Sequence, residues 1–505
     1  MKRVWVSVGI AVVLSAAGAA LVDRWLRVGP PADLEERVAT FGERPAAFAV
    51  SFPGEFLASS GEPADWTGDW PAFRGPNRDG ISPEGVRLAR EWPAAGPPVL
   101  WSIAVGEGYA GAAVHKGRVY LLDYDEEAKG DCLRCLSLAD GREIWRRWYK
   151  VPIQPNHGIS RTVPAVTDKY VVTLGPKCHV MCVDARTGDF RWALDLVREF
   201  GTQEPLWYAG QCPLIDGGRA ILAPAGPSAL LMAVDCETGK VVWKTPNPDG
   251  WQMTHTSVVP FEVDGVRMYL YTASGGVAGV AAEDGPAWKA GEILWTHPWK
   301  VNFANCPSPL ALGDGRLFLT GGYGTGSLVL QVRQRQWRFE AEEVLRLEAK
   351  EFSAEQHTPV YYGGHFYGVM AKEAGALGNQ LACLDPSGRL LWSSGRENRF
   401  GMGPFMVADG LLLALEEKGT LVLAEASPNG YVPLAQAKVL ADGYEAWGPL
   451  ALAGGRLILR DLTRMVCLDL RADRGAAPRV AVESPTLSAA KGGETNRRGG
   501  GRRRG

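Results

Sequence analysis

The chain has 505 residues, of which 46% are hydrophobic and 22% charged, and its formal net charge at pH 7 is −2. This composition is ordinary for a folded protein, and the near-zero charge argues against a nucleic-acid binder, which usually carries a strongly basic face. The high contents of Gly (62), Pro (34) and Trp (18) are typical of a fold with many turns between short strands.

The first element is an apolar run over residues 4–22, preceded by Lys2 and Arg3. The run is about long enough to cross a bilayer, and its positive flank should stay in the cytoplasm. The small residues 17–19 (AGA) also form a candidate cleavage site. Residues 1–22 are therefore predicted to be a signal peptide or an N-terminal membrane anchor. Either alternative places the rest of the chain on the periplasmic side of the cytoplasmic membrane, anchored, or free in the periplasm if the segment is cleaved.

Three further zones follow in chain order. Residues 23–65 are rich in Pro, Ala and Glu and are interpreted as a linker. Residues 66–475 are occupied by a repeat. Residues 476–505 are a basic Gly/Arg-rich tail that cannot bury a core and is expected to be disordered. Contact of this tail with an acidic surface or nucleic acid remains an alternative.

The repeat is visible as one short pattern written several times. Residues 135–145 (CLSLADGREIW), 182–192 (CVDARTGDFRW) and 233–243 (AVDCETGKVVW) each place a Gly four residues before a Trp. The Trp recurs at intervals of 44 to 52 residues, with one double interval of 97, at Trp101, Trp145, Trp192, Trp243, Trp295 and Trp392. Weaker copies occupy 326–349, 419–440 and 465–470, which brings the count to eight.

Each period contains short apolar or β-branched runs separated by Gly-containing turns, such as the strand that starts at Gly117 (GRVYLLD). Four short antiparallel strands in 44–52 residues are the signature of a propeller blade. The predicted fold is therefore all-β, an eight-bladed β-propeller of four-stranded antiparallel blades. The last copy stops before any Trp, and residues 97–106 (PPVLWSIAVG), with Trp101, are expected to supply its missing outer strand. Pairing this N-terminal strand with the C-terminal blade would close the ring and remove two open sheet edges.

Two residue types have predicted structural roles in the repeat. The six Trp residues are expected to lock neighbouring blades, because burial of an indole stabilises by on the order of 3 kcal/mol. Four cysteines fall at one repeat position inside apolar strands and are expected to be buried small hydrophobes. They are Cys135, Cys182, Cys383 and Cys467.

The pattern D-x-x-T-G-x-x-x-W resembles the repeat of the PQQ-like (pyrroloquinoline-quinone repeat) β-propeller family, over residues 66–475. The preceding segment 69–82 (DWPAFRGPNRDGIS) is similar to a segment found in exported PQQ-like propellers. The resemblance implies one of two branches: the quinoprotein dehydrogenases, with PQQ and Ca²⁺ in the axial funnel, or non-catalytic BamB-like exported propellers. The dehydrogenases carry an adjacent cysteine pair, a calcium and catalytic-acid cluster and often a haem motif. The sequence has no Cys-Cys and no such recognisable cluster or motif, so it is placed closer to the BamB-like branch.

Candidate ligand-binding residues lie in the loops that precede the innermost strands, because these loops surround the funnel of a propeller. They are His157, Arg161, Thr162, Gln211, Trp251, His255, Thr256, Asn305, Glu355, His357, Glu445 and Trp447, with Trp207 adding flat surface. The alternative is that such residues satisfy backbone groups around a water-filled channel. No catalytic or metal-ligating set is assigned.

Three functions follow from these observations. The first is an exported, membrane-anchored propeller that acts as a non-catalytic binding or protein-interaction scaffold, with a protein partner in the cell envelope and no cofactor. The second is a PQQ-dependent oxidoreductase with Ca²⁺, acting on an alcohol or a sugar. The third is a sensor propeller for a small ligand. The folded domain is expected to be a monomer and to bind no nucleic acid.

Overall fold

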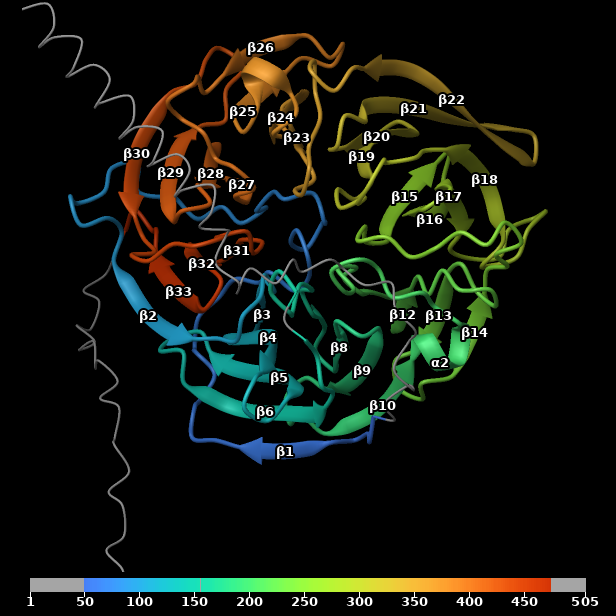
Figure 1. Ribbon diagram of the computed structural model, residues 1–505, viewed down its shortest axis with the longest axis horizontal. Helices are drawn as coiled ribbons and strands as arrows, with labels where there is room; N and C mark the ends of the chain where they lie inside the picture. Colours follow the sequence, from blue (N-terminus) through green and yellow to red (C-terminus); the bar gives the residue numbers. More distant parts are fainter. Residues whose placement is uncertain (1–49, 155, 474–505) are drawn as a thin grey trace, which may run out of the picture. The chain divides into compact units, whose positions relative to one another are not determined.

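The computed structural model describes residues 50–154 and 156–473, which belong to one compact unit. Their strands form eight antiparallel sheets arranged as the blades of a propeller (Figure 1). This confirms the predicted all-β, eight-bladed fold. The predicted N-terminal segment 1–22, the basic tail 476–505 and residues 23–49 of the predicted linker lie outside the described residues. Within the described ranges, no helix combines the length and the apolar character required to cross a bilayer.

The strands of each blade are numbered from the innermost outwards. Blades 1 to 4 comprise β3 (Ala113–His115), β4 (Arg118–Asp125), β5 (Gly130–Ser137) and β6 (Glu143–Lys150); β7 (Ala165–Val166), β8 (Tyr170–Leu174), β9 (His179–Asp184) and β10 (Phe190–Asp195); β11 (Leu214–Asp216), β12 (Arg219–Leu222), β13 (Met232–Asp235) and β14 (Val241–Lys244); β15 (Val259–Val263), β16 (Val266–Ala273), β17 (Gly276–Ala281) and β18 (Ile293–Pro298). Blades 5 to 8 comprise β19 (Leu310–Gly313), β20 (Arg316–Gly321), β21 (Gly326–Arg335) and β22 (Arg338–Leu347); β23 (Val360–Tyr362), β24 (His365–Val369), β25 (Leu381–Leu384) and β26 (Leu390–Ser393); β27 (Phe405–Ala408), β28 (Leu411–Leu415), β29 (Thr420–Glu425) and β30 (Pro433–Lys438); β31 (Ala451–Ala453), β32 (Arg456–Arg460), β33 (Arg464–Asp469) and β2 (Val99–Ala104). The remaining elements are a one-turn helix, α2 (Leu196–Phe200), a short 3₁₀ turn, η1 (Gly375–Leu377), and β1 (Glu55–Ala58).

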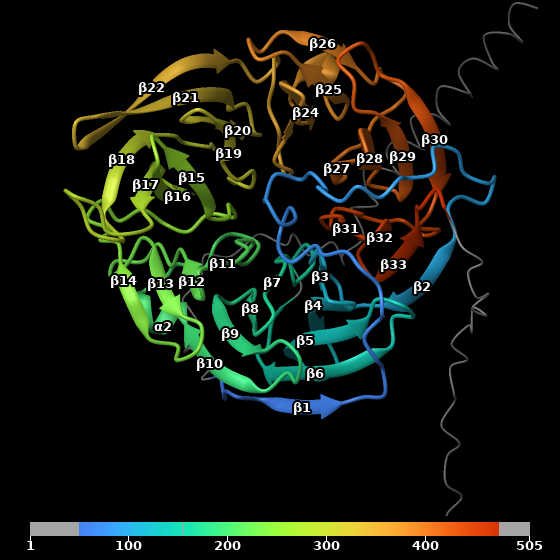
Figure 2. The same cartoon turned by 180° about the vertical axis from the view of Figure 1, so that it is seen from behind.

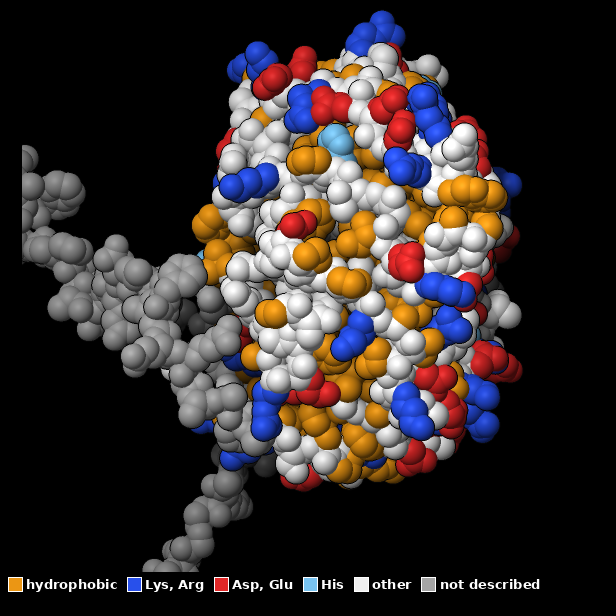
Figure 3. All heavy atoms as spheres, turned by 90° about the vertical axis from the view of Figure 1, so that its right-hand side faces the viewer, with side chains coloured by type: hydrophobic (Ala, Val, Ile, Leu, Met, Phe, Trp, Pro, Cys, Tyr) orange, Lys and Arg blue, Asp and Glu red, His pale blue; other side chains and the backbone are white. Residues whose placement is uncertain are grey.

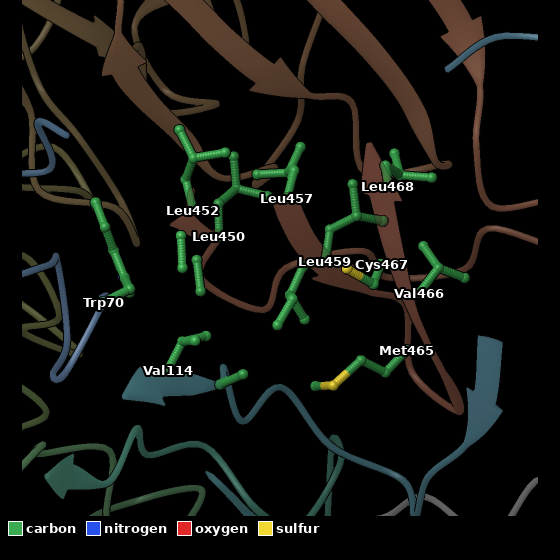
Figure 4. Packing of buried hydrophobic residues seen from close by; sticks show 14 of the residues in the cluster. Trp70, Val114, Leu450, Leu452, Leu457, Leu459, Met465, Val466, Cys467 and Leu468 are labelled. Atoms are coloured by element: carbon green, nitrogen blue, oxygen red, sulfur yellow. The ribbon is translucent and has the colours of Figure 1, made fainter. Parts of the chain in front are cut away.

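The ring is closed in the predicted way, by an N-terminal strand in the last blade. β2 pairs antiparallel with β33, and Trp101 lies opposite Cys467. The blade packs through Leu457, Leu459 and Leu468, which are at most 1% exposed (Figure 4). Because these strands are covered on both faces by neighbouring blades, their sequences are nearly continuous apolar runs.

Each repeat Trp meets the turn of the next blade. The indole Nε1 of Trp101 donates to the carbonyl of Leu138 in blade 1 at 2.9 Å. Equivalent bonds run from Trp145 to Arg186 (3.1 Å), from Trp192 to Cys236 (2.8 Å) and from Trp392 to Ser427 (2.8 Å). Trp243 and Trp295 depart from this pattern: Trp243 Nε1 has no partner among the described residues, and Trp295 Nε1 contacts the sulfur of Met268 in its own blade.

The turn Gly has two reasons to be Gly, as position 239 shows. Its φ of 70° lies in the left-handed region, which costs a residue with a Cβ more than glycine. A Cβ there would also lie 2.6 Å from Cγ of Trp192, the indole of the preceding blade. The repeated pattern therefore encodes contact between blades.

We expect Gly239→Ala to lower the free energy of unfolding by roughly 1–3 kcal/mol, through backbone strain and overpacking against Trp192. The matched control is Gly250→Ala, whose φ is 64° but whose Cβ would meet nothing within 4 Å. Urea unfolding of both variants separates the two effects. Equal losses would mean that contact with the indole adds nothing.

The four cysteines at the shared repeat position are free and buried, as predicted. Cys135, Cys182, Cys383 and Cys467 are each 0% exposed. Their environment is apolar strand on both sides, so they pack as small hydrophobes.

The predicted linker 23–65 differs from the structure at its C-terminal end. β1, within that stretch, forms a fifth strand on blade 1 by pairing with β6, from Glu55 opposite Trp148 to Ala58 opposite Trp145. The sequence gave no repeat signal for this strand because EFLA lies outside the repeating unit. Residues 55–58 therefore belong to the propeller.

The segment 69–82 crosses the ring on the way from β1 to β2 (Figure 2). Trp70 pairs with Val114 of blade 1, the carbonyl of Pro71 accepts from Val166 of blade 2, and Ser82 donates to Val407 of blade 7. Arg74 is anchored in blade 6, where Nη1 donates to the carbonyl of Thr358 at 2.6 Å. These contacts lie toward the C-terminal ends of innermost strands, so the segment closes the axial channel opposite the loops that precede those strands.

Candidate functional site

A cavity of about 380 Å³ lies at the axis, between the closing segment and the loops that precede the innermost strands. Six aromatic side chains line it: Phe73, Tyr109, Trp207, Phe303, Tyr323 and Trp447. Its polar lining consists of His157, Arg161, Cys212, His255, Cys306, Glu355, Gln356, His357 and Lys372, and Gly210, Met402 and Pro449 complete it. The volume falls in the range of small-molecule sites, which combine apolar walls with a few polar groups.

Six of the predicted residues gather around this cavity, although they come from blades far apart in the sequence. They are His157, Arg161, His255, Glu355, His357 and Trp447. Trp207, which the sequence offered as flat surface, lines it as well.

Three predicted residues instead satisfy backbone groups, as the alternative interpretation proposed. Thr162 Oγ1 donates to the carbonyl of Leu174, and Thr256 Oγ1 donates to the carbonyl of Thr272. The Gln211 amide both donates to and accepts from the backbone of Ala223. All three tie a loop to the second strand of the same blade and are at most 1% exposed.

The other three predicted residues lie outside the cavity lining. Trp251 covers the tight turn at Gly275, where a Cβ would lie 2.2 Å from the indole Nε1. Asn305 is 7% exposed, and its Oδ1 has no partner among the described residues. Glu445 accepts a hydrogen bond from the hydroxyl of Tyr109, which lines the cavity.

A chain of side-chain acceptors links the innermost strands of successive blades. The amide of Val163 donates to Sγ of Cys212, the amide of Cys212 to Oγ of Ser257, and the amide of Ser257 to Oγ of Ser308. The amide of Ser308 then donates to Oγ1 of Thr358 at 2.8 Å. The chain satisfies backbone donors that would otherwise be orphaned at the blade interfaces, and it holds the loops of blades 2 to 6 in one arrangement.

Arg161 organises one side of the cavity. Its Nη2 donates to the carbonyls of Asn156 (3.1 Å), His157 (2.6 Å) and Gly158 (3.1 Å), and its Nε donates to the carbonyl of Trp207. Burial lowers the pKa of the guanidinium below its ordinary value. Arg161 thus joins the loops of blades 2 and 3.

The imidazoles and the thiol in the cavity are neutral at pH 7. Burial lowers the pKa of His255 and of His357 to about 4. His357 Nε2 lies 3.0 Å from the carbonyl of Met402 and therefore carries the proton, which leaves Nδ1 as an acceptor. Burial also raises the pKa of Cys306 to about 12. These groups offer neutral hydrogen bonding.

The one carboxylate among the cavity-lining residues, Glu355, has a cationic partner. Oε1 of Glu355 lies 3.2 Å from Nζ of Lys372, and Glu355 is 7% exposed. The hydroxyl of Tyr109 binds Glu445 near Arg161, so a second carboxylate balances the guanidinium from behind the wall. The cavity is close to electrically neutral.

Several lining residues were missed by the sequence analysis. Phe73, Tyr109, Phe303, Cys306, Tyr323 and Lys372 were not among the candidates. Tyr323 and Lys372 lie in loops between the second and third strands of their blades. In an antiparallel blade these loops lie at the same end as the loops before the innermost strands, so strand order was the signal that could have found them.

Blade 5 carries a second feature that the ring does not require. β21 and β22 have 10 residues each, and their hairpin projects past the neighbouring strands (Figure 1). Trp337 at its turn is 60% exposed. The blade-locking place is taken by Leu347, whose Cδ2 would lie 2.6 Å from a Cβ at Gly388 of blade 6. Trp337 is therefore a large aromatic side chain with no role in closing the ring.

The fold and the enclosed axial cavity define an eight-bladed PQQ-like propeller. The family model described as outer membrane protein assembly factor BamB matches residues 91–204 and 128–374, and the chain belongs to this family. A comparison with curated proteins gives no match.

Similar solved structures come from both branches of this fold. BamB from Moraxella catarrhalis superposes with a TM-score of 0.50 at 13% identity, covering 74% of this chain and 99% of BamB. A europium-containing methanol dehydrogenase gives 0.56 at 13% identity, covering 78% and 89%. The quinohemoprotein alcohol dehydrogenase from Comamonas testosteroni gives 0.55 at 11% identity, covering 82% of each chain. At these identities the similarities establish the shared fold.

The cavity residues do not fit PQQ with Ca²⁺. Calcium takes six to eight oxygen ligands, mostly carboxylates and carbonyls, whereas the carboxylate lining this cavity is Glu355 and it is paired with Lys372. Across residues 50–154 and 156–473, no group of three or more His, Cys, Asp and Glu side chains is placed to hold a metal. PQQ is a tricarboxylate, and the near-neutral lining offers it no excess of positive charge.

Proposed function

We propose that this protein is an exported, membrane-anchored propeller that acts as a non-catalytic protein-interaction scaffold in the cell envelope. The observation that carries the proposal is the projecting hairpin with Trp337. Trp and Arg dominate the energetics of protein interfaces, and a Trp that is 60% exposed at a turn has no structural benefit in the free protein. Export and anchoring rest on residues 1–22, and a partner in the envelope is in keeping with membership of the BamB family.

The charges on the hairpin define the partner's chemistry. Arg333 pairs with Glu342 at 3.0 Å, and Arg335 pairs with Glu340 at 3.2 Å. Arg338, beside Trp337, has no acidic partner among the described residues. On the side that carries β14, β18 and β22, hydrophobic side chains lie in small groups among charged ones (Figure 3). The partner is therefore a protein with an apolar pocket for one indole and an acidic rim.

The chemistry of the axial cavity supports the non-catalytic part of the proposal. A general base works best when its pKa lies near the operating pH, whereas His255 and His357 have pKa values of about 4. Glu355 is held by Lys372, and the Cys306 thiol has a pKa of about 12. We therefore propose a monomeric protein without a quinone cofactor, whose folded domain binds no nucleic acid.

We expect Trp337→Ala to abolish capture of the envelope partner while leaving the fold intact, because loss of a central Trp anchor costs 2 kcal/mol or more of binding, roughly 30-fold in Kd. The measurement is cross-linking in native membranes with the full chain, followed by quantification of the cross-linked product. The matched control is Val242→Ala, an exposed residue on the outer strand of blade 3 (47% exposed). Equal yields from wild type, Trp337→Ala and Val242→Ala would refute the docking role of the hairpin.

A further inference from the structure

The aromatic side of the cavity is held in a strained backbone. His157, Trp207 and Tyr323 have φ values of 53°, 62° and 56°. Bulky residues avoid this left-handed region, and strain of this kind is concentrated at functional sites, where the surrounding structure enforces it. The enforcing contacts for two of them are those of Arg161, which binds the carbonyls of His157 and Trp207.

These residues form a continuous arc of rings. The ring centroids of His157 and Trp207 are 5.9 Å apart, those of Trp207 and Phe303 are 5.3 Å apart, and those of Phe303 and Tyr323 are also 5.3 Å apart. Phe303, in the middle of the arc, is 59% exposed. An aromatic arc that is rigid before binding and open to water is suited to contact with a ligand, because little ordering remains to be done.

The polar groups around the cavity select the charge of that ligand. Gln356, the neutral His255 and His357, and the Glu355–Lys372 pair offer donors and acceptors without a strong net charge. A polyanion would meet no excess of cations, and a quaternary ammonium ion would meet no excess of anions. The lining therefore favours a neutral ligand that is rich in hydrogen-bonding groups.

We propose that the axial cavity binds a neutral saccharide of one or two rings, with its C–H faces against the arc of Trp207, Phe303 and Tyr323. Sugar C–H groups are weakly polarised toward aromatic faces, and sugar hydroxyls both donate and accept. The hydroxyls are met by Gln356, by Nδ1 of His357 and by the Glu355–Lys372 pair. The 380 Å³ cavity limits the ligand to a small saccharide or to the end of a longer chain. This site is independent of the hairpin, so either proposal can fail without the other.

The test is isothermal titration calorimetry on the full chain, in a detergent that has no sugar head group. The probes are maltose, cellobiose and N,N′-diacetylchitobiose, with PQQ plus Ca²⁺ and choline as charged comparators. We expect at least one of the sugars to bind with a Kd below about 1 mM, and neither comparator to bind more tightly than that sugar. Phe303→Ala should weaken the sugar at least tenfold, and Gln356→Ala should weaken it as well.

The control is Trp337→Ala, which lies on the hairpin and should leave the sugar affinity unchanged. Because Phe303 and Trp337 are similarly exposed (59% and 60%), neither variant is expected to disturb folding. The proposal is overturned if none of the three sugars binds, if Phe303→Ala binds the sugar as tightly as wild type, or if PQQ or choline binds in preference. A negative result here, with partner cross-linking still dependent on Trp337, would remove the saccharide and leave the scaffold function standing.

Discussion

Trp101→Ala should lower the free energy of unfolding by roughly 3–5 kcal/mol, the range for truncation of a buried Trp. Trp101 is 6% exposed and lies in β2, the strand that completes the last blade. Its indole donates to Leu138 of blade 1 and covers Gly141, where a Cβ would lie 3.0 Å from the ring. The substitution therefore weakens the single junction at which the first and last parts of the ring meet.

Urea unfolding, followed by far-UV circular dichroism, measures the effect. Trp337→Ala is the matched control, because it removes an equally large side chain that is 60% exposed, and it should change stability by no more than about 0.5 kcal/mol. If Trp101→Ala unfolds at the same urea concentration as wild type, the closing junction contributes little to the stability of the ring.

The second large effect concerns a buried carboxyl between blades 1 and 2. Asp131 is 0% exposed, and its Oδ2 accepts from the hydroxyl of Tyr149 at 2.8 Å. Its Oδ1 has no partner among the described residues. Burial raises the pKa of Asp131 to about 7, because a desolvated carboxylate is disfavoured.

The sign of the pH dependence follows from this shift. The native state keeps the proton up to about pH 7, whereas the unfolded chain releases it near pH 4. The native state thus binds more protons within this window, and the free energy of unfolding falls as the pH rises from 4 to 7. A shift of about three pKa units corresponds to about 4 kcal/mol.

We expect Asp131→Asn to remove this loss, since the amide keeps an acceptor for Tyr149 and does not ionise. The variant should match wild type near pH 4 and exceed its stability by up to about 4 kcal/mol at pH 8. Urea unfolding of both proteins between pH 4 and 8 measures the difference. A difference that does not change with pH would show that Asp131 ionises normally in the folded protein.

The fold was predictable because the repeat states its own geometry. The interval between Trp residues gave the blade, and the missing Trp after residues 465–470 pointed to Trp101 as its replacement. β1 was missed because a fifth strand obeys no repeat, and its short sequence resembles the Pro/Ala-rich stretch around it. Pairing of that kind is decided by an open sheet edge, which is a tertiary property.

The cavity was only half predictable, for a different physical reason. Position in the repeat placed His157, His255 and His357 near the axis, but it could not tell which polar side chains turn back to the backbone, as Thr162 and Thr256 do. The aromatic arc escaped because Phe303 and Tyr323 reach it from two kinds of loop. Their side chains meet only after the blades are assembled.

The pairing of β2 with β33 has a consequence for how the chain folds. Residues 99–104 must find residues 464–469, so the last junction joins parts of the chain more than 350 residues apart. Long-range contacts of this kind form late, because loop closure costs entropy before any contact compensates for it. During synthesis, blades 1 to 7 can form while β2 and the exposed edge of the ring wait for the end of the chain. The nascent protein therefore passes through a stage with two unpaired sheet edges, and that stage is where protection from aggregation is most needed.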